Sequence, residues 1–316
     1  MIRISCIHER KQKYGKDRKG NQRYKCCLCG QTFGQDSPKP LGDMRISMKD
    51  ATTILGLLVE GMSVRAVERI TGTCRKTICD LILVVGENCQ GLLESKINAV
   101  PATDVQLDEI WSFVGMKERT RVATARSSEW GDSWTFIAID RETKLVLAHE
   151  IGQRDMATSV RFLNRLDRAT TGRFQLSSDG LGSYTLNVPF VFGSRVDFAQ
   201  LIKNFQSTQS TVRYSPAKIT NTEKLPRFGN PDFDRICTSH VERLNLTLRM
   251  NLRRFTRLTN AHSKSAKHHA AMQAIFFAYY NFVRVHETIK KTPAMAAGVV
   301  EKQWTMRELL EKAAEC

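Results

Sequence analysis

The chain has 316 residues, of which 41% are hydrophobic and 8% aromatic, a composition typical of folded domains rather than of a disordered chain. No apolar run approaches the roughly 18 residues of a membrane-spanning helix, and the charged N-terminus lacks the apolar stretch of a signal peptide, so we expect a cytoplasmic protein with no membrane partner. Lysine and arginine number 48 against 32 aspartate and glutamate, and the net charge of +16 favours a polyanionic partner such as nucleic acid.

Residues 1–36 form a basic segment that contains four of the nine cysteines. The pair Cys26-x-x-Cys29 resembles one knuckle of a zinc ribbon, in which two cysteines on a tight turn bind Zn²⁺. The other knuckle is altered, because Glu9 stands where a second cysteine is expected after Cys6. His8 offers a substitute ligand. We interpret the segment either as a zinc-ribbon-like domain or as a degenerate finger that persists as a basic arm, and the candidate ligands of a structural Zn²⁺ are Cys6, His8, Cys26 and Cys29.

Residues 44–98 have the apolar spacing of helices. A first helix precedes two further helices that are joined by a short turn at Gly72, with Val64, Val67 and Ile70 expected to face inward on the earlier helix of the pair. This is the pattern of a helix-turn-helix domain, whose second helix enters the major groove with its N-terminal residues forward. An αα-hairpin without a DNA role has the same pattern. The candidate DNA-binding residues are Arg75, Lys76 and Thr77.

Residues 103–290 alternate between strand-like and helical patterns. A β-rich stretch at 104–117, a hairpin at 133–152, a helix near 156–170, a strand that ends at Asp179 and a later strand at 195–203 predict a mixed sheet with helices on both faces, an α/β fold. The polar stretch 204–234 is expected to be a long loop of functional importance. Two further helices follow, and residues 291–316 are expected to form a C-terminal tail with a helix.

Three acidic residues of this region are candidate metal ligands: Asp108 in the first strand, Asp179 at the end of the fourth, and Glu242 early in a helix. If the first and fourth strands are neighbours, these carboxylates converge and suit Mg²⁺ or Mn²⁺, which prefer hard oxygen ligands. Each also has a structural explanation. Asp108 could be a charge at a strand edge, Asp179 a turn residue before glycine, and Glu242 part of a capping box with Ser239.

The helix that carries Glu242 supports the metal interpretation. Its apolar stripe, Val241, Leu244, Leu248, Leu252 and Phe255, fixes which side is buried. Glu242, Asn245 and Arg249 share the adjoining side, with Arg253 expected one turn further. Arginine two turns after a metal-binding carboxylate could hold a phosphate of the substrate backbone.

Four separated stretches closely resemble the transposases of the insertion-sequence-one family of bacterial and archaeal mobile elements. They are LDEIWSFVGMKE, SSDG, TSHVERLNLTLRMNLRRFTRLTNA and YYNFVRVHETIKKTPAMAAGV, and the resemblance covers residues 44 to 300 approximately. It implies a DDE transposase with a ribonuclease-H-like core, whose acidic triad falls on Asp108, Asp179 and Glu242 and whose basic residue falls on Arg249. It also implies an N-terminal zinc finger and a helix-turn-helix that recognise the inverted repeats at the element's ends. Glu9 departs from the finger's pattern.

We therefore predict a nucleoid-associated DNA transposase that uses two Mg²⁺ or Mn²⁺ ions, with Arg249 and Arg253 on the DNA backbone and with element ends and target DNA as partners. Both ends must be cut together, so a homo-oligomer on DNA is expected. Two alternatives remain: a sequence-specific DNA-binding repressor with an inactive core, and a nuclease of the same fold such as a junction resolvase.

Overall fold

A computed structural model describes residues 9–16, 22–34, 39–206, 218–256 and 259–316. The chain divides into two compact units, Met1–Lys39 and Pro40–Cys316. Within the described ranges, no helix combines the length and the apolarity that a membrane crossing requires.

The small N-terminal unit contains a three-stranded antiparallel sheet of β1 (Lys11–Lys16), β2 (Gln22–Cys26) and β3 (Thr32–Gly34). Strands β2 and β3 are joined by a tight turn, in which the N–H of Gly30 donates to the carbonyl of Cys26 at 3.0 Å. Gly30 has φ +73°, a conformation that glycine adopts without strain. The Cys26-x-x-Cys29 pair therefore lies on a tight turn between two strands.

The larger unit begins with helices α1 (Met48–Val59), α2 (Val64–Thr71) and α3 (Arg75–Lys96). Ser63 caps α2 by accepting the N–H of Ala66, and Gly72 ends it in the left-handed conformation, so the predicted helix pair with a short turn is present. Val67 is fully buried as expected. The prediction for Ile70 was wrong: its side chain is 60% exposed, because it lies near the end of the short helix α2, of which only Val67 is fully buried while Val64 packs against the core partly buried.

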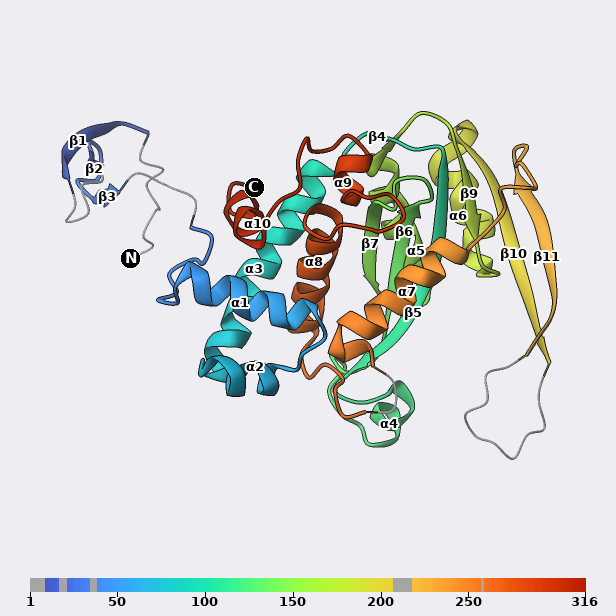
Figure 1. Ribbon diagram of the computed structural model, residues 1–316, viewed down its shortest axis with the longest axis horizontal. Coiled ribbons are helices and arrows are strands. Elements are labelled where there is room, and N and C mark those ends of the chain that lie inside the picture. Colours follow the sequence, from blue (N-terminus) through green and yellow to red (C-terminus); the bar gives the residue numbers. More distant parts are fainter. Residues whose placement is uncertain (1–8, 17–21, 35–38, 207–217, 257–258) are drawn as a thin grey trace. The chain divides into compact units, whose positions relative to one another are not determined.

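Helix α3 packs along α8 (Ala266–Phe282), which is buried over most of its length. At the crossing point Gly86 meets Ala271, and a Cβ on Gly86 would lie 2.4 Å from the Cβ of Ala271. A side chain at this glycine would therefore push the two helices apart. Because α8 also packs on the sheet, the helices predicted for residues 44–98 and the α/β region share one core (Figure 1).

The large sheet has six strands in the order β11-β10-β9-β5-β6-β7. Strands β5, β6 and β7 are antiparallel neighbours, β9 and β10 run parallel to β5, and β11 is antiparallel to β10. The predicted neighbourhood of the first and fourth strands is therefore present. The strands are β5 (Asp104–Val114), β6 (Gly131–Asp140), β7 (Val146–Gly152), β9 (Phe174–Ser178), β10 (Val196–Gln206) and β11 (Lys218–Phe228), and a separate two-residue pair joins β4 (Val100–Pro101) to β8 (Thr170–Thr171).

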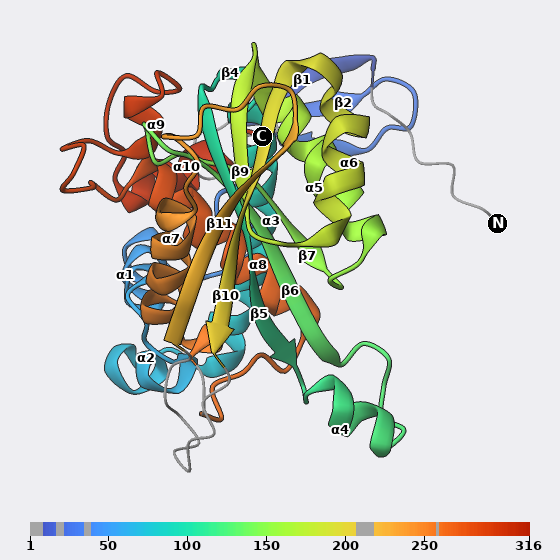
Figure 2. The same ribbon diagram turned by 90° about the vertical axis from the view of Figure 1, so that its right-hand side faces the viewer.

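Helices cover both faces of the sheet (Figure 2). One face carries α5 (Met156–Ala169) and α6 (Gly182–Phe192), and the other carries α7 (Ser239–Asn251) and α8. The strand residues alternate accordingly: Phe136 of β6 contacts Phe162 of α5, while its neighbour Thr135 donates to Gln273 of α8. The shorter elements are α4 (Glu118–Ala123), α9 (Pro293–Ala296), α10 (Met306–Ala313) and the 3₁₀ turns η1 (Gly193–Arg195) and η2 (Arg253–Phe255).

The long loop predicted for residues 204–234 was wrong in part, because Lys218–Phe228 form the edge strand β11. Most described side chains of β11 are exposed, since β11 is an edge strand and the β10–β11 pair extends past β9. A polar sequence there gives no alternation of apolar and polar residues, the signal by which strands are recognised.

Candidate metal-binding site

The pairing of β5 with β9 brings Asp108 and Asp179 together. The parallel register places Leu107 opposite Ser178, so the two aspartates are the next residues on neighbouring strands. Asp179 is also a turn residue, because its Oδ1 accepts the N–H of Leu181 at 3.0 Å. The same carboxylate therefore both stabilises the turn and belongs to the candidate site.

Glu109 joins these aspartates, which the sequence did not predict. Carboxylate oxygens of Asp108, Glu109 and Asp179 all lie within 4.8 Å of one another. Adjacent strand residues point to opposite faces, so strand geometry alone would direct Glu109 away from Asp108. Its side chain is instead held beside the end of β9, where the Tyr184 hydroxyl donates to its Oε1 at 2.5 Å.

Burial and mutual repulsion raise the proton affinity of these groups. Burial raises the pKa of Asp108 to about 6, and the negative charges of Asp179 and Glu242 add to the effect. Burial, followed by repulsion from Asp179, raises the pKa of Glu109 to about 8, so Glu109 holds a proton at neutral pH. A divalent cation would relieve this repulsion and favour the ionised forms.

Arg154 already supplies one positive charge beside the cluster. Its guanidinium lies 4.9 Å from the ring centre of Trp134, and it donates to Oε2 of Glu109 at 3.1 Å and to Oδ2 of Asp179 at 3.4 Å. This arginine bridges the two carboxylates, and like Glu109 it was not predicted from the sequence.

Glu242 lies near the aspartates but outside their cluster. Its side chain is 44% exposed and forms an ion pair with Lys203 of β10. The hydroxyl of Thr238 donates to Oε1 of Glu242 at 2.5 Å. The capping box that was considered for this glutamate is absent: Thr238, not Ser239, is the N-cap residue. The negative charge of Glu242 nevertheless contributes to the raised pKa of Asp108, so the two carboxylates share one electrostatic environment.

Three alternate residues of β5 hold α7 against the sheet. Oε1 of Gln106 accepts the N–H groups of His240 at 2.9 Å and Val241 at 3.3 Å, in the first turn of α7. Two residues along the strand, Oδ2 of Asp108 accepts Nδ2 of Asn245 at 2.8 Å. Two residues in the other direction, the fully buried Asp104 binds Arg235, which precedes the helix. The period of two along β5 thus fixes both the position and the rotation of the helix that carries Glu242.

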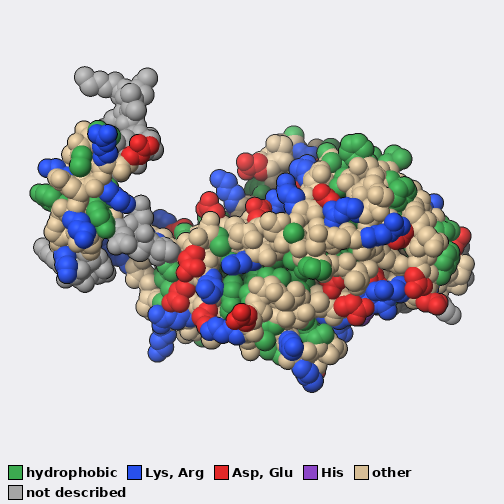
Figure 3. Space-filling model, turned by 90° about the horizontal axis from the view of Figure 1, so that it is seen from above, with side chains coloured by type: hydrophobic (Ala, Val, Ile, Leu, Met, Phe, Trp, Pro, Cys, Tyr) green, Lys and Arg blue, Asp and Glu red, His purple; other side chains and the backbone are tan. Residues whose placement is uncertain are grey.

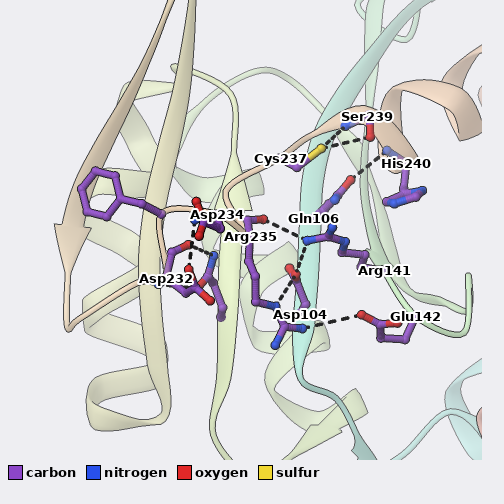
Figure 4. A network of polar contacts seen from close by, with 12 residues as sticks. Asp104, Gln106, Arg141, Glu142, Asp232, Asp234, Arg235, Cys237, Ser239 and His240 are labelled. Carbon is purple, nitrogen blue, oxygen red and sulfur yellow. Dashed lines mark hydrogen bonds and ion pairs between the residues drawn. The ribbon is translucent and has the colours of Figure 1, made fainter.

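Asp104 is the centre of a larger polar network (Figure 4). Its Oδ2 accepts Arg141 at 3.0 Å and Arg235 at 3.2 Å, and Arg235 also pairs with Glu142 at 3.7 Å. Arg141 donates to the carbonyl of Arg235 as well, so the β6–β7 turn is joined to the segment that leads into α7. Burial raises the pKa of Asp104, and the bonds from the two arginines oppose the effect.

The point at which α7 ends determines where the predicted basic residues lie. Arg249 is half-buried in its last turn, two turns after Glu242. Arg253 does not continue this row, because Leu252 has φ −107° and ψ +103°, which ends the helix, and Arg253 lies in the 3₁₀ turn beyond it. All five apolar residues predicted to be buried on this helix and turn are buried.

The other predicted sites lie apart from this cluster in the chain. Arg75 and Lys76 are exposed and Thr77 is half-buried in the first turn of α3, where Glu68 of α2 pairs with Arg75 at 2.8 Å. In the N-terminal unit Cys26 is buried and Cys29 is exposed. Cys6 and His8 lie outside the described residues.

The donor set fits a divalent cation such as Mg²⁺ or Mn²⁺. The candidate ligands are carboxylate oxygens, and Oδ1 of Asn245 is buried without a hydrogen-bond partner among the described residues. Hard oxygen donors of this kind suit these ions, whereas no cysteine or histidine is a member of the cluster.

Comparison with known proteins identifies the domain that carries this site. Residues 103–212 match the family model of the IS1 transposase. Over this domain the chain is similar to the IS1 transposases. The iso-IS1n protein InsB of Shigella dysenteriae is 28% identical over 177 residues, which span 56% of this chain and 95% of that protein. The IS1 2 protein InsB of Escherichia coli is 39% identical over 70 residues, which span 21% of this chain and 35% of that protein. The resemblance drawn from the sequence motifs is confirmed.

The curated Escherichia coli relatives are matched over only about a third of their length, 35%. Among solved structures, the piggyBac transposase synaptic complex with hairpin DNA aligns with 86% of this chain and 73% of that chain at 10% identity. The TM-score is 0.33, a value at which the two folds are not shown to be the same.

Proposed function

We propose that this protein is a DNA transposase that cuts DNA at the ends of its insertion element and joins them to a target. The observation that carries the proposal is the placement of Asp108 beside Asp179, on neighbouring strands of an IS1 transposase domain, with the charge of Glu242 close enough to raise the pKa of Asp108. In the reaction, water breaks the phosphodiester bond and leaves a 3′-OH, and that hydroxyl displaces a 3′-oxygen from a phosphate of the target.

A ribonuclease-H-like core for residues 103–290 is part of the proposal. It is supported by three antiparallel strands, β5 to β7, followed across β5 by the parallel strands β9 and β10. Helices on both faces support it as well. In such an arrangement the C-terminal end of β9 lies beside the middle of β5, and α7 packs on β5, which brings carboxylates from three distant parts of the chain close to one place.

Asp108, Asp179 and Glu242 would hold one or two Mg²⁺ or Mn²⁺ ions. Bound metal stabilises the attacking and leaving oxygens of an in-line displacement. Glu242 would join the set by leaving its ion pair with Lys203 and binding the metal. This change costs little free energy because the glutamate is partly exposed. Arg249, two turns along the same helix, would position the phosphate, and Arg253 would contact the DNA backbone beyond it.

Recognition of the element's ends is assigned to the segments that precede the sheet. Helices α2 and α3 would act as a helix-turn-helix, since the first turn of α3 is exposed at Arg75 and Lys76 before its first fully buried residue, Ile78. Residues 1–39 carry ten Lys and Arg against three Asp and Glu, which favours contact with DNA phosphates. A structural Zn²⁺ on Cys6, His8, Cys26 and Cys29 would order that segment, and a homo-oligomer would bring two ends together.

On the face shown in Figure 3, basic and acidic side chains are interspersed over the larger unit rather than separated by sign. Affinity for DNA on this face would therefore depend on particular arginines and lysines and less on a single basic patch.

Cleavage of three labelled DNA substrates tests the function. They are a duplex with the element's terminal repeat, a duplex with the same bases scrambled, and a four-way junction. A transposase cuts the repeat at its boundary in Mg²⁺ and not in EDTA, and leaves a 3′-OH. Binding to the repeat without cutting would instead support the repressor. Preferential cutting of the junction would support the resolvase.

A further inference from the structure

Asn245 is placed at the candidate site by the same helix that carries Glu242, one turn further along. The residue is 4% exposed. Its Nδ2 donates to Oδ2 of Asp108 at 2.8 Å, while its Oδ1 is buried and has no hydrogen-bond partner in the described part of the chain. One amide thus supplies a donor to a candidate metal ligand and an unused hard oxygen next to it.

The docking of α7 does not depend on this amide alone. The helix is already held by Gln106 at its first turn, by Asp104 through Arg235, and by its buried apolar stripe. A buried acceptor without a partner costs free energy, and an apolar side chain at position 245 would avoid that cost. The bond to Asp108 explains the Nδ2 half of the amide, and the buried Oδ1 is explained by something that it binds.

We propose that Asn245 is a positioning residue of the metal site: it orients the Asp108 carboxylate through Nδ2 and presents Oδ1 as a neutral oxygen donor to the bound divalent cation. This inference rests on the proposed metal-dependent function. Amide oxygens are ordinary partners for Mg²⁺ and Mn²⁺, and a neutral donor adds a ligand without adding to the repulsion among Asp108, Glu109 and Asp179.

The test is calorimetric titration of the full chain with Mn²⁺ alone, without DNA. We expect Asn245→Leu to weaken Mn²⁺ binding by about tenfold or more, the usual effect of removing a group that orients a metal ligand. Asn245→Asp keeps an oxygen at that position but loses the Nδ2 donor, so it is expected to bind Mn²⁺ more tightly than Asn245→Leu. Asn251→Leu is the matched control, because Asn251 lies on the same helix but donates to the carbonyl of Val59 at 3.2 Å, away from the carboxylates.

Three results distinguish failure of the role proposed for Asn245 from failure of the proposed metal site. Unchanged Mn²⁺ affinity in Asn245→Leu, with binding lost in Asp108→Asn, would overturn the role of Asn245 and leave the metal site intact. Equal loss in Asn245→Leu and Asn245→Asp would show that an oxygen at position 245 adds nothing to Mn²⁺ binding and would overturn the role of Oδ1 as a ligand. If the wild type binds no Mn²⁺ that Asp108→Asn removes, the proposed metal-dependent function itself fails. Thermal unfolding of each variant in EDTA shows whether it is folded.

Discussion

Replacement of Gln106 should release the N-terminus of α7 and with it Glu242. The fully buried Gln106 is bonded through Oε1 to the N–H groups of His240 and Val241. These are among the amides that have no partner within the helix itself, and α7 has no side-chain cap of its own. Methionine at position 106 has a similar length and volume but no acceptor, so Gln106→Met leaves both donors unpaired with little change in packing.

The size of the effect follows from those two bonds. Each of the two buried donors without a partner costs roughly 1–3 kcal/mol. The half-exposed His240 can recover part of this from water, and the change also removes Nε2 of Gln106, which is buried without a partner among the described residues, so the expected loss is about 2 kcal/mol. For a unit of this size that corresponds to a fall in the midpoint of thermal unfolding of roughly 4–8 °C. Urea unfolding gives the free energy, and hydrogen exchange should show faster exchange in the first turn of α7.

Gln273→Met is the control for general destabilisation. Gln273 is a fully buried glutamine of α8 that accepts the Thr135 hydroxyl at 2.9 Å. Its replacement should also lower stability, but exchange in the first turn of α7 should not change. The reasoning is refuted if Gln106→Met is as stable as the wild type, or if it loses stability while the amides of α7 remain protected.

Three other predictions concern pH, DNA affinity and zinc. Burial lowers the pKa of both His149 and His269 from 6.5 to about 3, so the unfolded state binds more protons below pH 6.5 and stability falls as the pH falls; the free-energy difference between wild type and His269→Gln should shrink by roughly 2 kcal/mol from pH 7 to pH 5, and a constant difference would contradict this. Changing Arg75 and Lys76 to Ala should reduce the slope of log affinity against log salt by up to about 2, while Arg307→Ala leaves it unchanged; equal slopes in all three proteins would argue against the helix-turn-helix. Elemental analysis should find zinc in the wild type and none after replacement of the first cysteine of the C-x-x-C pair, and zinc retained in that variant would contradict the proposed ligands.

Much of the arrangement was predictable from the pattern of residues. The two apolar runs at 133–152 form a hairpin, and the carboxylate before Gly180 does end a strand next to the first strand of the sheet. These features depend on local alternation and on turn residues, which a sequence displays directly.

Other features depend on tertiary contacts that leave no local signal. Glu109 alternates to the opposite face from Asp108, and only the positions of Tyr184 and Arg154, far away in the chain, bring its carboxylate to the cluster. Ile70 satisfies helical spacing, yet the end of a two-turn helix does not reach the core. Gln106 was not predicted either, because its role is to cap a helix from a neighbouring strand.

The central claim is that Asp108, Asp179 and Glu242 together cut DNA, and single-turnover cleavage of a duplex with the terminal repeat tests it most directly. Wild type, Asp108→Asn, Asp179→Asn and Glu242→Gln would be compared in Mn²⁺ with Ser239→Ala, a neighbour of the site that lies outside the proposed ligands. The account predicts that each of the three carboxylate variants binds the repeat as the wild type does but cleaves no faster than the protein-free control, while Ser239→Ala cleaves normally. Cleavage by any of the three at the wild-type rate would contradict it.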